Sequence, residues 1–479
     1  MRRLISLRTM KEGEQGAGGI RRRFKGCLCM NELIVIGGGF AGVEAAWQAA
    51  RIGARVRLYE MRPVQQTPAH RTDKLGEIVC SNSLKSDEPG TAPYLLKEEL
   101  RRGGSIVMEA AEATRVPAGA ALAVDRHKFA DFITERIEAH PNIEVERREV
   151  TRIPDGEITV VATGPLTSEA LTAEIMRLTG DDQLYFYDAI APIVAADTIN
   201  TEVAFRAARY GKGGDDYLNC PFDEEEYARF YNELTNAKSV PLQRFEETRW
   251  FEACLPIEEL ARRGVDTLRY GPMKPVGLTN PRTGRQPYAA VQLRQENVLA
   301  DAYSLVGFQN HLRFGEQARV LRLIPGLEDA EFLQYGQIHR NTYICAPRCL
   351  APTLQMREKP TLFFAGQITG VEGYVESVAS GWLAGLNAAR QAFKLPLKLA
   401  PSKSATGALA RYVSSADPKT YQPANITFAL LEPLAEELKR RVRRKQERRH
   451  LQVELALKEW DTWLYTIHNK TEMPLAATG

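Results

Sequence analysis

Apolar and polar positions alternate along much of the chain in the manner of an α/β protein. The apolar run 33–36 leads into a segment rich in small residues, and a second strand pattern covers 54–60, so residues 33–60 predict a β-α-β unit. Residues 157–164 predict a buried strand ending in a glycine, and 361–365 predict another strand followed by a helix to about Ala392. Strands that alternate with helices are typical of a parallel sheet, so we expect a Rossmann-like α/β fold.

This alternation breaks down in the middle of the chain. Asp223 is placed to cap an acidic helix over 224–238, and loops rich in proline and glycine follow at 271–277 and 280–284. We interpret this stretch as a smaller α+β domain inserted into the Rossmann-like domain. The predicted division is an N-terminal extension at 1–29, the two parts of the cofactor-binding domain at 30–196 and 335–400, the insertion at 197–334, and a C-terminal helical segment at 401–479.

A glycine-rich turn joins the first predicted strand to its helix. Gly37 permits the tight turn, Gly39 lets the backbone approach a pyrophosphate, and Gly42 lets helix and strand pack closely. The helix start supplies unpaired N–H groups and a favourable dipole, so the turn suits an anion. The second strand ends in Glu60, about 20 residues further on, where a carboxylate can accept hydrogen bonds from a ribose hydroxyl. The alternative is a glycine-rich turn that binds no ligand.

A second strand, glycine turn and helix, late in the chain, indicates which dinucleotide binds. NAD needs only the first β-α-β unit, whereas the extended FAD molecule needs more backbone to hold its ribityl chain and flavin ring. The strand ends at Gly164 and Gly366 can supply this backbone, and the helix after Gly373 can direct N–H groups at the pyrimidine edge of the flavin. We therefore predict FAD as the cofactor, and the alternative for the second motif is a tight turn without a ligand.

Composition and charge are those of an ordinary globular protein. Of the 479 residues, 26% are charged and 44% are hydrophobic, and no apolar run approaches the roughly 20 residues of a membrane span. The net charge is +3, and residues 1–29 carry eight Lys or Arg against two Glu, so the basic excess is confined to this leader. The leader lacks the apolar core of a secretory signal. We expect residues 1–29 to be a disordered extension and the protein to be cytoplasmic.

The seven cysteines form the pattern of neither a disulfide framework nor a metal site. Their number is odd and the chain shows no secretory signal, so we expect reduced thiols. The two closely spaced pairs, Cys27 with Cys29 and Cys345 with Cys349, lack a second cysteine or histidine pair at zinc spacing. We therefore predict no bound metal.

Cys80 and Cys254 have surroundings that set them apart from the other thiols. Cys80 precedes a polar turn, 81–83, whose backbone and hydroxyl donors are expected to lower its pKa. Cys254 lies two residues before Pro256, and a helix beginning near Ile257 would place a positive dipole end close to its sulfur. Taken alone, each is better explained as a buried, inert thiol, because free cysteine is among the most buried residue types.

A basic segment lies near the C-terminus. Positive charge over 439–449, in a helical pattern, is too dense to be balanced by carboxylates four residues away. Such a run can follow a phosphate backbone without reading its sequence, whereas the alternative is a solvated helix face. The predicted RNA-binding residues are Lys439, Arg440, Arg441, Arg443 and Arg444.

Five separated motifs carry a resemblance to a known family. They are Tyr59–His70, Cys80–Ser86, Phe251–Glu258, Gly271–Leu278 and Ala365–Ser377. Together they resemble the TrmFO family, the folate- and FAD-dependent tRNA (uracil-5-)-methyltransferases, and the likeness runs from Met30 to about Pro433. The related GidA/MnmG family shares the FAD-binding frame and a similar late turn, but the contexts of Cys80 and Cys254 resemble TrmFO.

The resemblance implies an activity. Methylenetetrahydrofolate would give a one-carbon unit to reduced FAD, which passes it to C5 of the T-loop uridine (position 54) of tRNA and forms 5-methyluridine. NADH or NADPH would restore the reduced flavin. Uracil C5 is a poor nucleophile until a thiolate adds to C6, so the reaction needs a cysteine beside the flavin. By resemblance, Cys254 is the nucleophile at C6, and Cys80 acts on the flavin-bound methylene or in removing the C5 proton.

The predicted cofactor-binding residues combine the glycine motifs with their neighbours in the family motifs. They are Gly37, Gly38, Gly39, Phe40, Ala41, Gly42, Glu60, Arg62, Gly164, Gly366, Gln367, Gly373 and Tyr374. Four other functions remain open: GidA-like modification of the wobble uridine, a tRNA-binding flavoprotein without catalysis, an NAD(P)H oxidoreductase without RNA or folate, and an S-adenosylmethionine methyltransferase. The last of these would not need the second flavin-type motif.

Overall fold

A parallel sheet forms the centre of the cofactor-binding part of the fold. The computed structural model of the chain describes residues 31–180, 184–241 and 255–468, and the predicted extension at 1–29 lies outside these ranges. The α/β fold class is confirmed. The sheet has five parallel strands, in the order β16 (Leu362–Phe364), β7 (Thr159–Val161), β1 (Glu32–Ile36), β2 (Arg55–Glu60) and β6 (Ile143–Arg147).

The register brings the carboxyl ends of the central strands together. Ile36 at the end of β1 lies opposite Tyr59 on one side and Val161 on the other, and Val161 lies opposite Phe364. The glycine turns that follow β1, β7 and β16 therefore leave the sheet at the same edge. Ligands of open α/β sheets bind at this edge.

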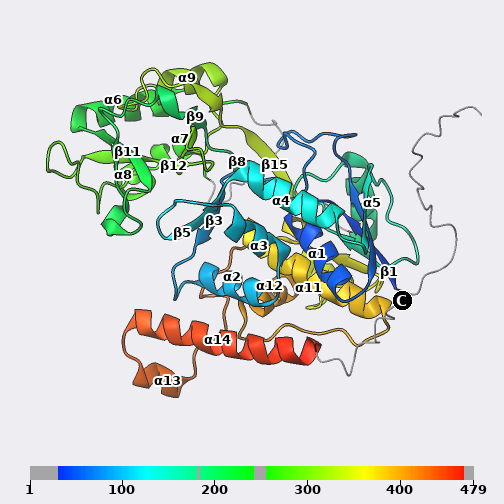
Figure 1. The fold of residues 1–479 in the computed structure, drawn as a ribbon. Coiled ribbons are helices and arrows are strands. Elements are labelled where there is room, and N and C mark those ends of the chain that lie inside the picture. Colours follow the sequence, from blue (N-terminus) through cyan, green and yellow to red (C-terminus); the bar gives the residue numbers. More distant parts are fainter. Residues whose placement is uncertain (1–30, 181–183, 242–254, 469–479) are drawn as a thin grey trace, which may run out of the picture. The chain divides into compact units, whose positions relative to one another are not determined.

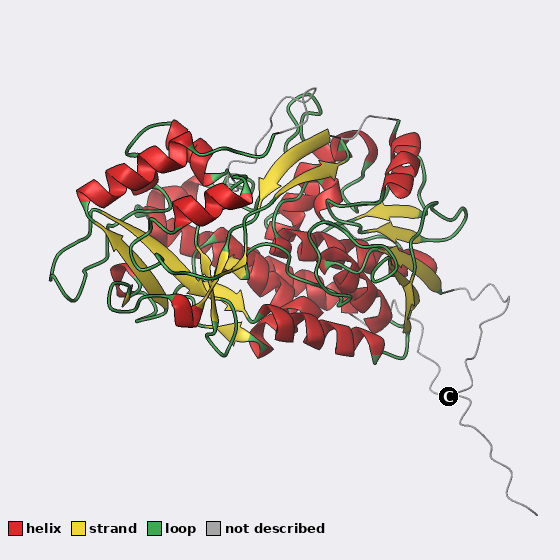
Figure 2. Ribbon diagram, turned by 90° about the horizontal axis from the view of Figure 1, so that it is seen from above, coloured by secondary structure: helices red, strands yellow, loops and turns green. Residues whose placement is uncertain are grey.

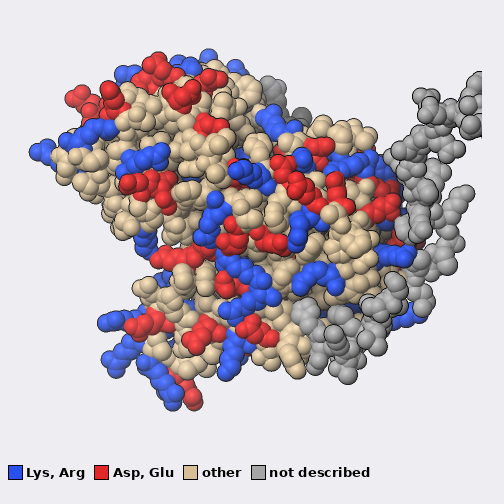
Figure 3. Space-filling model, in the orientation of Figure 1, with Lys and Arg blue, Asp and Glu red and all other residues tan. Residues whose placement is uncertain are grey.

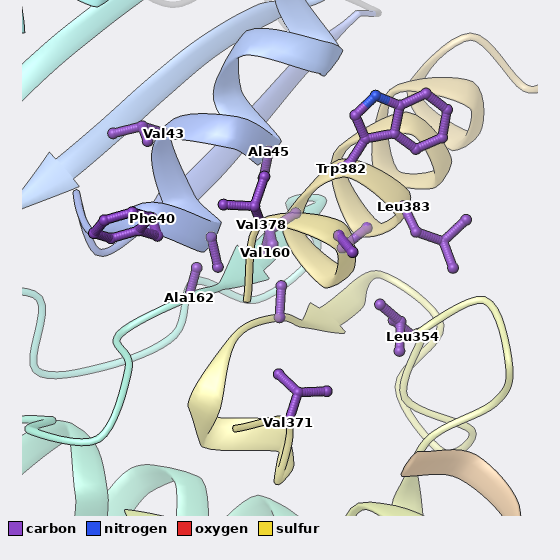
Figure 4. Close-up of a cluster of buried hydrophobic side chains, with 14 of the residues drawn as sticks. Phe40, Val43, Ala45, Val160, Ala162, Leu354, Val371, Val378, Trp382 and Leu383 are labelled. Atoms are coloured by element: carbon purple, nitrogen blue, oxygen red, sulfur yellow. The ribbon is translucent and has the colours of Figure 1, made fainter. Parts of the chain in front are cut away.

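Two helices of small residues cross closely above this sheet. They are α1 (Phe40–Arg51) and α11 (Tyr374–Ala392). A Cβ atom at Gly381 would lie 2.2 Å from the carbonyl oxygen of Ala41, and one at Gly385 would lie 2.3 Å from that of Ala45. Only glycine allows the two backbones to approach so closely. Figure 4 shows the buried side chains around this crossing, with Phe40 at the start of α1 and Trp382 on α11.

A second sheet, built from the middle of the chain, has its own hydrophobic core. Its six strands are antiparallel, in the order β10 (Phe205–Arg206), β11 (Tyr217–Phe222), β12 (Ala289–Gln295), β13 (Ala302–Leu305), β9 (Ile193–Ala195) and β14 (Phe332–Gln334). The helices beside it are α6 (Glu224–Asn236), α7 (Ile257–Arg262), α8 (Thr267–Tyr270) and α9 (Phe314–Leu321) (Figures 1 and 2). The domain boundaries at 197 and 334 stay a prediction.

Local signals place the helix starts of this part as expected. The Asp223 side chain accepts a hydrogen bond from the backbone N–H of Glu226, and the Glu226 side chain accepts one from that of Asp223. This reciprocal cap satisfies two backbone donors at the start of α6. The helix predicted near Ile257 is also present, as α7.

The remaining elements connect and cover these two sheets. Two small antiparallel sheets pair β8 (Leu184–Ala189) with β15 (Ile338–Tyr343), and β3 (Ser83–Ser86) with β5 (Ala121–Val124) and β4 (Arg115–Val116). The other helices are α2 (Ala92–Arg102), α3 (Ile106–Ala113), α4 (Arg126–Glu138), α5 (Glu169–Thr179) and α10 (Ala346–Cys349). Within the described ranges, no helix is long and apolar enough to cross a membrane.

The C-terminal segment is helical and packs back onto the cofactor-binding part. It contains α12 (Ala405–Ser415), α13 (Glu436–Arg441) and α14 (Lys445–His468), and α14 runs along α2 (Figure 1). The indole N–H of Trp460 donates to the carbonyl oxygen of Glu99 (2.8 Å). The ring centroids of Trp460 and Trp382 are 5.4 Å apart.

The helical pattern predicted over 439–449 is wrong in one respect, because the helix is interrupted after Arg441. The Arg448 side chain donates to the backbone carbonyls of Val442 (2.6 Å) and Lys439 (3.0 Å). The last carbonyls of a helix have no partner within it, and this guanidinium supplies one. The basic segment is therefore two helices joined by a bend.

Candidate cofactor and active site

The turn between β1 and α1 requires glycine for both conformation and space. Gly37 has φ +106°, and a Cβ atom there would lie 2.5 Å from the carbonyl oxygen of Ala162, directly after β7. A Cβ at Gly42 would lie 1.7 Å from the carbonyl oxygen of Gly37. Gly42 therefore lets the first turn of α1 pack against the glycine loop, as its spacing predicted.

Gly39 differs from its neighbours, because its missing side chain faces open space. A Cβ atom there would have no protein atom within 4 Å, and its φ of −78° is accessible to any residue. The open space belongs to a cleft of about 1020 Å³, partly open to solvent, that lies along the sheet edge. A helix N-terminus with free N–H groups beside unfilled space fits the pyrophosphate of a dinucleotide.

The carboxylate of Glu60 forms the next part of the cleft. It accepts hydrogen bonds from the backbone N–H of Gly38 (3.0 Å) and from both the backbone N–H and the Nε of Arg62 (2.9 Å each). Burial acts to raise the pKa of Glu60, but the hydrogen bonds and charge of Arg62 outweigh it and hold that pKa below its usual range. Glu60 is therefore an ionised acceptor, which suits a ribose hydroxyl.

Arg62 is itself 1% exposed and has a second carboxylate partner. Its Nη1 donates to Glu77 (2.7 Å) and to the carbonyl oxygen of Thr72 (3.1 Å). Because both acidic partners compensate the buried charge, Arg62 holds the cleft wall in place. The sequence motifs did not single out Glu77, which also lines the cleft.

A second loop closes the cleft from the late part of the chain. Gly366 has φ +82° and its missing side chain faces the Cβ of Ala41, at 2.8 Å. A short 3₁₀ turn, Gln367–Thr369, follows, and then α11 begins after Gly373. The ring of Tyr374 stacks on that of Phe40, with centroids 4.5 Å apart. The two glycine motifs are thus joined at the start of α1 and of α11.

Most of the predicted cofactor-binding residues line this one cleft. The structure places Gly37, Gly38, Gly39, Phe40, Ala41, Glu60, Arg62, Gly164, Gly366, Gln367 and Tyr374 on its wall. Gly42 and Gly373 are neighbours in sequence of the lining residues Ala41 and Tyr374, but they do not line the cleft themselves. The sequence reasoning missed the lining residues Thr67, His70, Thr163, Thr167 and Ser377. Ser377 lies on the first turn of α11, and the other four lie on loops whose approach to the cleft depends on contacts far apart in the sequence.

Cys80 lies in a half-buried turn beside this cleft. Its backbone N–H donates to the hydroxyl of Tyr374 (2.8 Å), and its neighbour Val79 lines the cleft. The predicted lowering of its pKa is wrong. Burial and then the charge of Asp188 raise the pKa of the Cys80 thiol to about 12, while the Ser81 backbone N–H and Arg126 act in the other direction. In this state the thiol keeps its proton at neutral pH.

A buried carboxyl shares this environment. The Glu372 side chain accepts a hydrogen bond from the Nε2 of Gln367 (2.6 Å), which lines the cleft. Burial, and then the charge of Asp188, raise the pKa of Glu372 to about 8. A carboxyl with such a pKa can take up or release a proton near neutral pH.

The other predicted site residues do not line the cleft as it is described. Cys254 lies outside the described residues, as do Cys27 and Cys29. The basic residues on α13 and in the bend after it are at the surface, and Figure 3 shows Lys and Arg side chains gathered there with acidic ones between them. Among the described residues, no cluster of His, Cys, Asp and Glu is arranged to hold a metal ion.

Comparisons with known proteins agree with this architecture. Residues 32–396 match the family model described as "Glucose inhibited division protein A". The structure of GidA from Aquifex aeolicus, in its form I crystal, aligns with a TM-score of 0.63 at 17% identity, covering 92% of this chain and 77% of that chain. At 17% identity, the likeness to the Aquifex aeolicus structure shows only that the two proteins share a fold.

Relatives of much higher identity match most of the chain. A protein of Koribacter versatilis named methylenetetrahydrofolate–tRNA-(uracil-5-)-methyltransferase TrmFO is 59% identical over 436 residues, covering 91% of this chain and 98% of the relative. A protein of Geobacter sulfurreducens with the same name is 54% identical, covering 91% of this chain and 99% of the relative. Because the family model spans more than half of the chain and these relatives are matched almost end to end, the chain belongs to the GidA family and, within it, to the TrmFO proteins.

Proposed function

We propose that this protein methylates C5 of the T-loop uridine of tRNA, at position 54. The one-carbon donor is methylenetetrahydrofolate, the cofactor is FAD, and NADH or NADPH is the reductant. Family membership and the names of the relatives support this proposal. The observation that carries it is the contact of Cys80 with Tyr374, because it puts a thiol-bearing turn against the wall of a cleft that fits FAD.

The residues of the cleft bind and orient the cofactor. The N–H groups at Gly39 and the start of α1 would hold the pyrophosphate, and Glu60, itself tied to the Gly38 N–H, would accept from a ribose hydroxyl. The N-terminus of α11 would offer partial positive charge to the pyrimidine edge of the flavin. When bound, FAD supplies the redox chemistry by which a one-carbon unit from folate becomes the methyl group of the base.

The thiols act on the uracil. The thiolate of Cys254 forms a bond to C6, and the electrons of the C5=C6 bond move toward O4, which makes C5 a nucleophile. After C5 has gained the new carbon, its proton leaves, the bond between sulfur and C6 breaks, and the double bond returns. We propose that Cys80 acts at the cofactor or at this C5 proton, with the Glu372 carboxyl beside it as the group that gives or takes a proton near neutral pH.

We also propose that the basic segment contacts the tRNA phosphate backbone. Arg440, Arg441 and Arg443 are exposed, and none of the three has an ion pair among the described residues. Lys439 pairs with Glu436 of its own helix (2.7 Å), and Arg444, directly before α14, pairs with Glu447 (3.4 Å); both glutamates are exposed. Such surface pairs are weak, so phosphate groups can replace them.

The test is to incubate the purified protein with methylenetetrahydrofolate, NADH or NADPH, and tRNA that lacks the modification, and to map the modified nucleosides. We expect 5-methyluridine at position 54, and none when S-adenosylmethionine replaces the folate. Product at the wobble position instead would favour the GidA-like alternative. FAD bound and tRNA bound without any product would leave a binding protein and contradict the proposal.

A further inference from the structure

The turn that carries Cys80 is held from the second sheet. Arg294, on β12, is 8% exposed. Its Nε donates to the side-chain oxygen of Asn82 (2.8 Å), and its Nη2 donates to the hydroxyls of Ser81 (2.7 Å) and Ser304 (3.3 Å). The guanidinium of Arg294 therefore donates hydrogen bonds to both of the residues that directly follow Cys80.

The other hydrogen bonds of Asn82 fix the orientation of its side-chain amide. Asn82 is 0% exposed, and its Nδ2 donates to the carbonyl oxygens of Val124 on β5 (2.9 Å) and Gln295 on β12 (3.0 Å). Its oxygen is thus left to accept from Arg294. A buried amide with both ends engaged has one orientation, so Asn82 is held both by the small sheet that contains β5 and by the six-stranded sheet that contains β12.

A second arginine holds the other side of the turn. Arg126, at the start of α4, donates through Nη2 to the carbonyl oxygen of Cys80 (3.1 Å) and through Nε to Glu296 (2.8 Å), directly after β12. Glu296 is 3% exposed, so this ion pair is shielded from solvent. Hydrogen bonds from charged groups are stronger than neutral ones, and several converge on three residues of the turn.

We propose that Arg294 is a positioning residue for Cys80, which fixes the thiol against the cofactor cleft through Ser81 and Asn82. The inference rests on the proposed function, because it assigns a role to the Cys80 thiol in methyl transfer. A reacting group displaced by about 1 Å can lose about 100-fold in rate. The alternative is that these contacts only join the small sheet of β3, β5 and β4 to the six-stranded sheet.

Turnover of the FAD-loaded enzyme on tRNA is the first readout. We expect Arg294→Met to lower kcat about 100-fold with the KM for tRNA, the FAD content and the circular dichroism unchanged. Arg294→Lys cannot reach both acceptors with one planar fork, so we expect an intermediate loss of about 10-fold. The matched control is Arg206→Met on β10, whose guanidinium contacts the Tyr303 hydroxyl and not the turn, and which should keep wild-type kcat.

Alkylation of Cys80 by iodoacetamide, followed on its peptide by mass spectrometry from pH 6 to 10, is a readout that needs no methyl transfer. Among the described cysteines, Cys220, Cys345 and Cys349 are buried and serve as internal references. We expect Arg294→Met to raise the rate at pH 8 at least about 10-fold and to shift the profile to lower pH, because the half-buried thiol becomes more exposed to solvent. The Arg206→Met profile should match the wild type.

The outcomes separate the two ideas. If the wild type shows no methyl transfer but Arg294→Met shows the expected alkylation shift, the proposed function is refuted, whereas the role of Arg294 in holding the Cys80 turn stands. An active wild type in which Arg294→Met keeps kcat within 2-fold would overturn the positioning role, whatever its alkylation. If Arg294→Met loses FAD or its fold, Ser81→Ala and Arg294→Lys decide: a several-fold loss of kcat with faster alkylation supports the proposal, and wild-type values for both overturn it.

Discussion

The backbone N–H of Gly38 donates to the carboxylate of Glu60, with 3.0 Å between nitrogen and oxygen. Gly38 lies in the turn between β1 and α1 and Glu60 ends β2, and Arg62 donates to the other oxygen of the same carboxylate. The pyrophosphate loop and the ribose acceptor are therefore tied together by the protein itself. The cleft is preorganised, so binding FAD does not have to order these groups.

The first prediction concerns Gly39. We expect Gly39→Val to fold normally but to lose FAD, with affinity at least about tenfold lower, or about 1.4 kcal/mol. Its Cβ would touch no protein atom within 4 Å, so the new side chain would fill the space that the pyrophosphate needs. The measurement is flavin absorbance per protein after purification, together with thermal melting of the apoprotein.

Gly315→Val is the matched control. A Cβ atom at this glycine on α9 would likewise have no protein atom within 4 Å, and the residue has an ordinary helical φ and lies away from the cleft. This variant should retain FAD. A yellow, fully loaded Gly39→Val protein would show that the pyrophosphate lies elsewhere.

The β-α-β unit and the glycine loops were predictable because their signals are local. The spacing of Gly37, Gly39 and Gly42 encodes a turn, an open approach and a close helix contact, and each glycine has that geometry in the structure. The Asp223 cap is equally local, since it depends on a residue three positions away. Such patterns need no knowledge of the tertiary fold.

The environment of Cys80 was not predictable in the same way. Its sequence neighbours are polar, but its pKa is raised first by burial and then by the charges of Asp188 and Glu372, which come from distant parts of the chain. Tyr374, which accepts from its backbone N–H, lies 294 residues away. The bend at Val442 was not predicted either, because it depends on the hydrogen bond that the Arg448 side chain donates to the Val442 carbonyl, which the helical pattern of the sequence does not reveal.

The second prediction concerns the pH dependence of stability through Glu44. This carboxyl on α1 is fully buried and accepts from Ser105 (2.6 Å) and Gln48 (2.7 Å). Burial raises its pKa from 4.5 to about 7, despite these hydrogen bonds. The unfolded chain releases the proton near pH 4.5 and the folded protein near pH 7. The contribution of Glu44 to the free energy of unfolding should therefore be highest below pH 4.5 and fall by up to about 3 kcal/mol as the pH rises to 7.

Urea unfolding of the wild type and of Glu44→Gln from pH 4.5 to 8 tests this. The stability difference, wild type minus variant, should decrease over this range and level off above pH 7. Glu99 has a similarly raised pKa but is present in both proteins, so its contribution cancels. Curves that stay parallel at all pH values would mean that Glu44 is ionised in the folded protein.

The third prediction concerns the basic segment. Replacing Arg440, Arg441 and Arg443 with Gln should weaken binding to all tRNAs and reduce the slope of log K against log salt by about 2 to 3, because each lost phosphate contact removes about 0.7 to 0.9. The measurement is binding affinity at several salt concentrations. The control replaces three exposed basic residues beside the second sheet, Arg229, Lys238 and Arg313, and matches the change in net charge. Equal slopes for both variants would assign the effect to net charge alone.

The fourth prediction concerns the two thiols. Cys254→Ala should lose methyl transfer and keep FAD, because the thiol adds to uracil and has no part in holding the pyrophosphate. A tRNA with 5-fluorouridine at the target has no C5 proton to release, so the wild type should remain covalently attached through C6. Denaturing gels of the enzyme with this tRNA measure the adduct. Cys80→Ala should fail in turnover but still form the adduct, since its role lies at the cofactor or at C5. An adduct with Cys254→Ala but not with Cys80→Ala would mean that the two roles are exchanged, and full activity of Cys254→Ala would remove the nucleophile assignment.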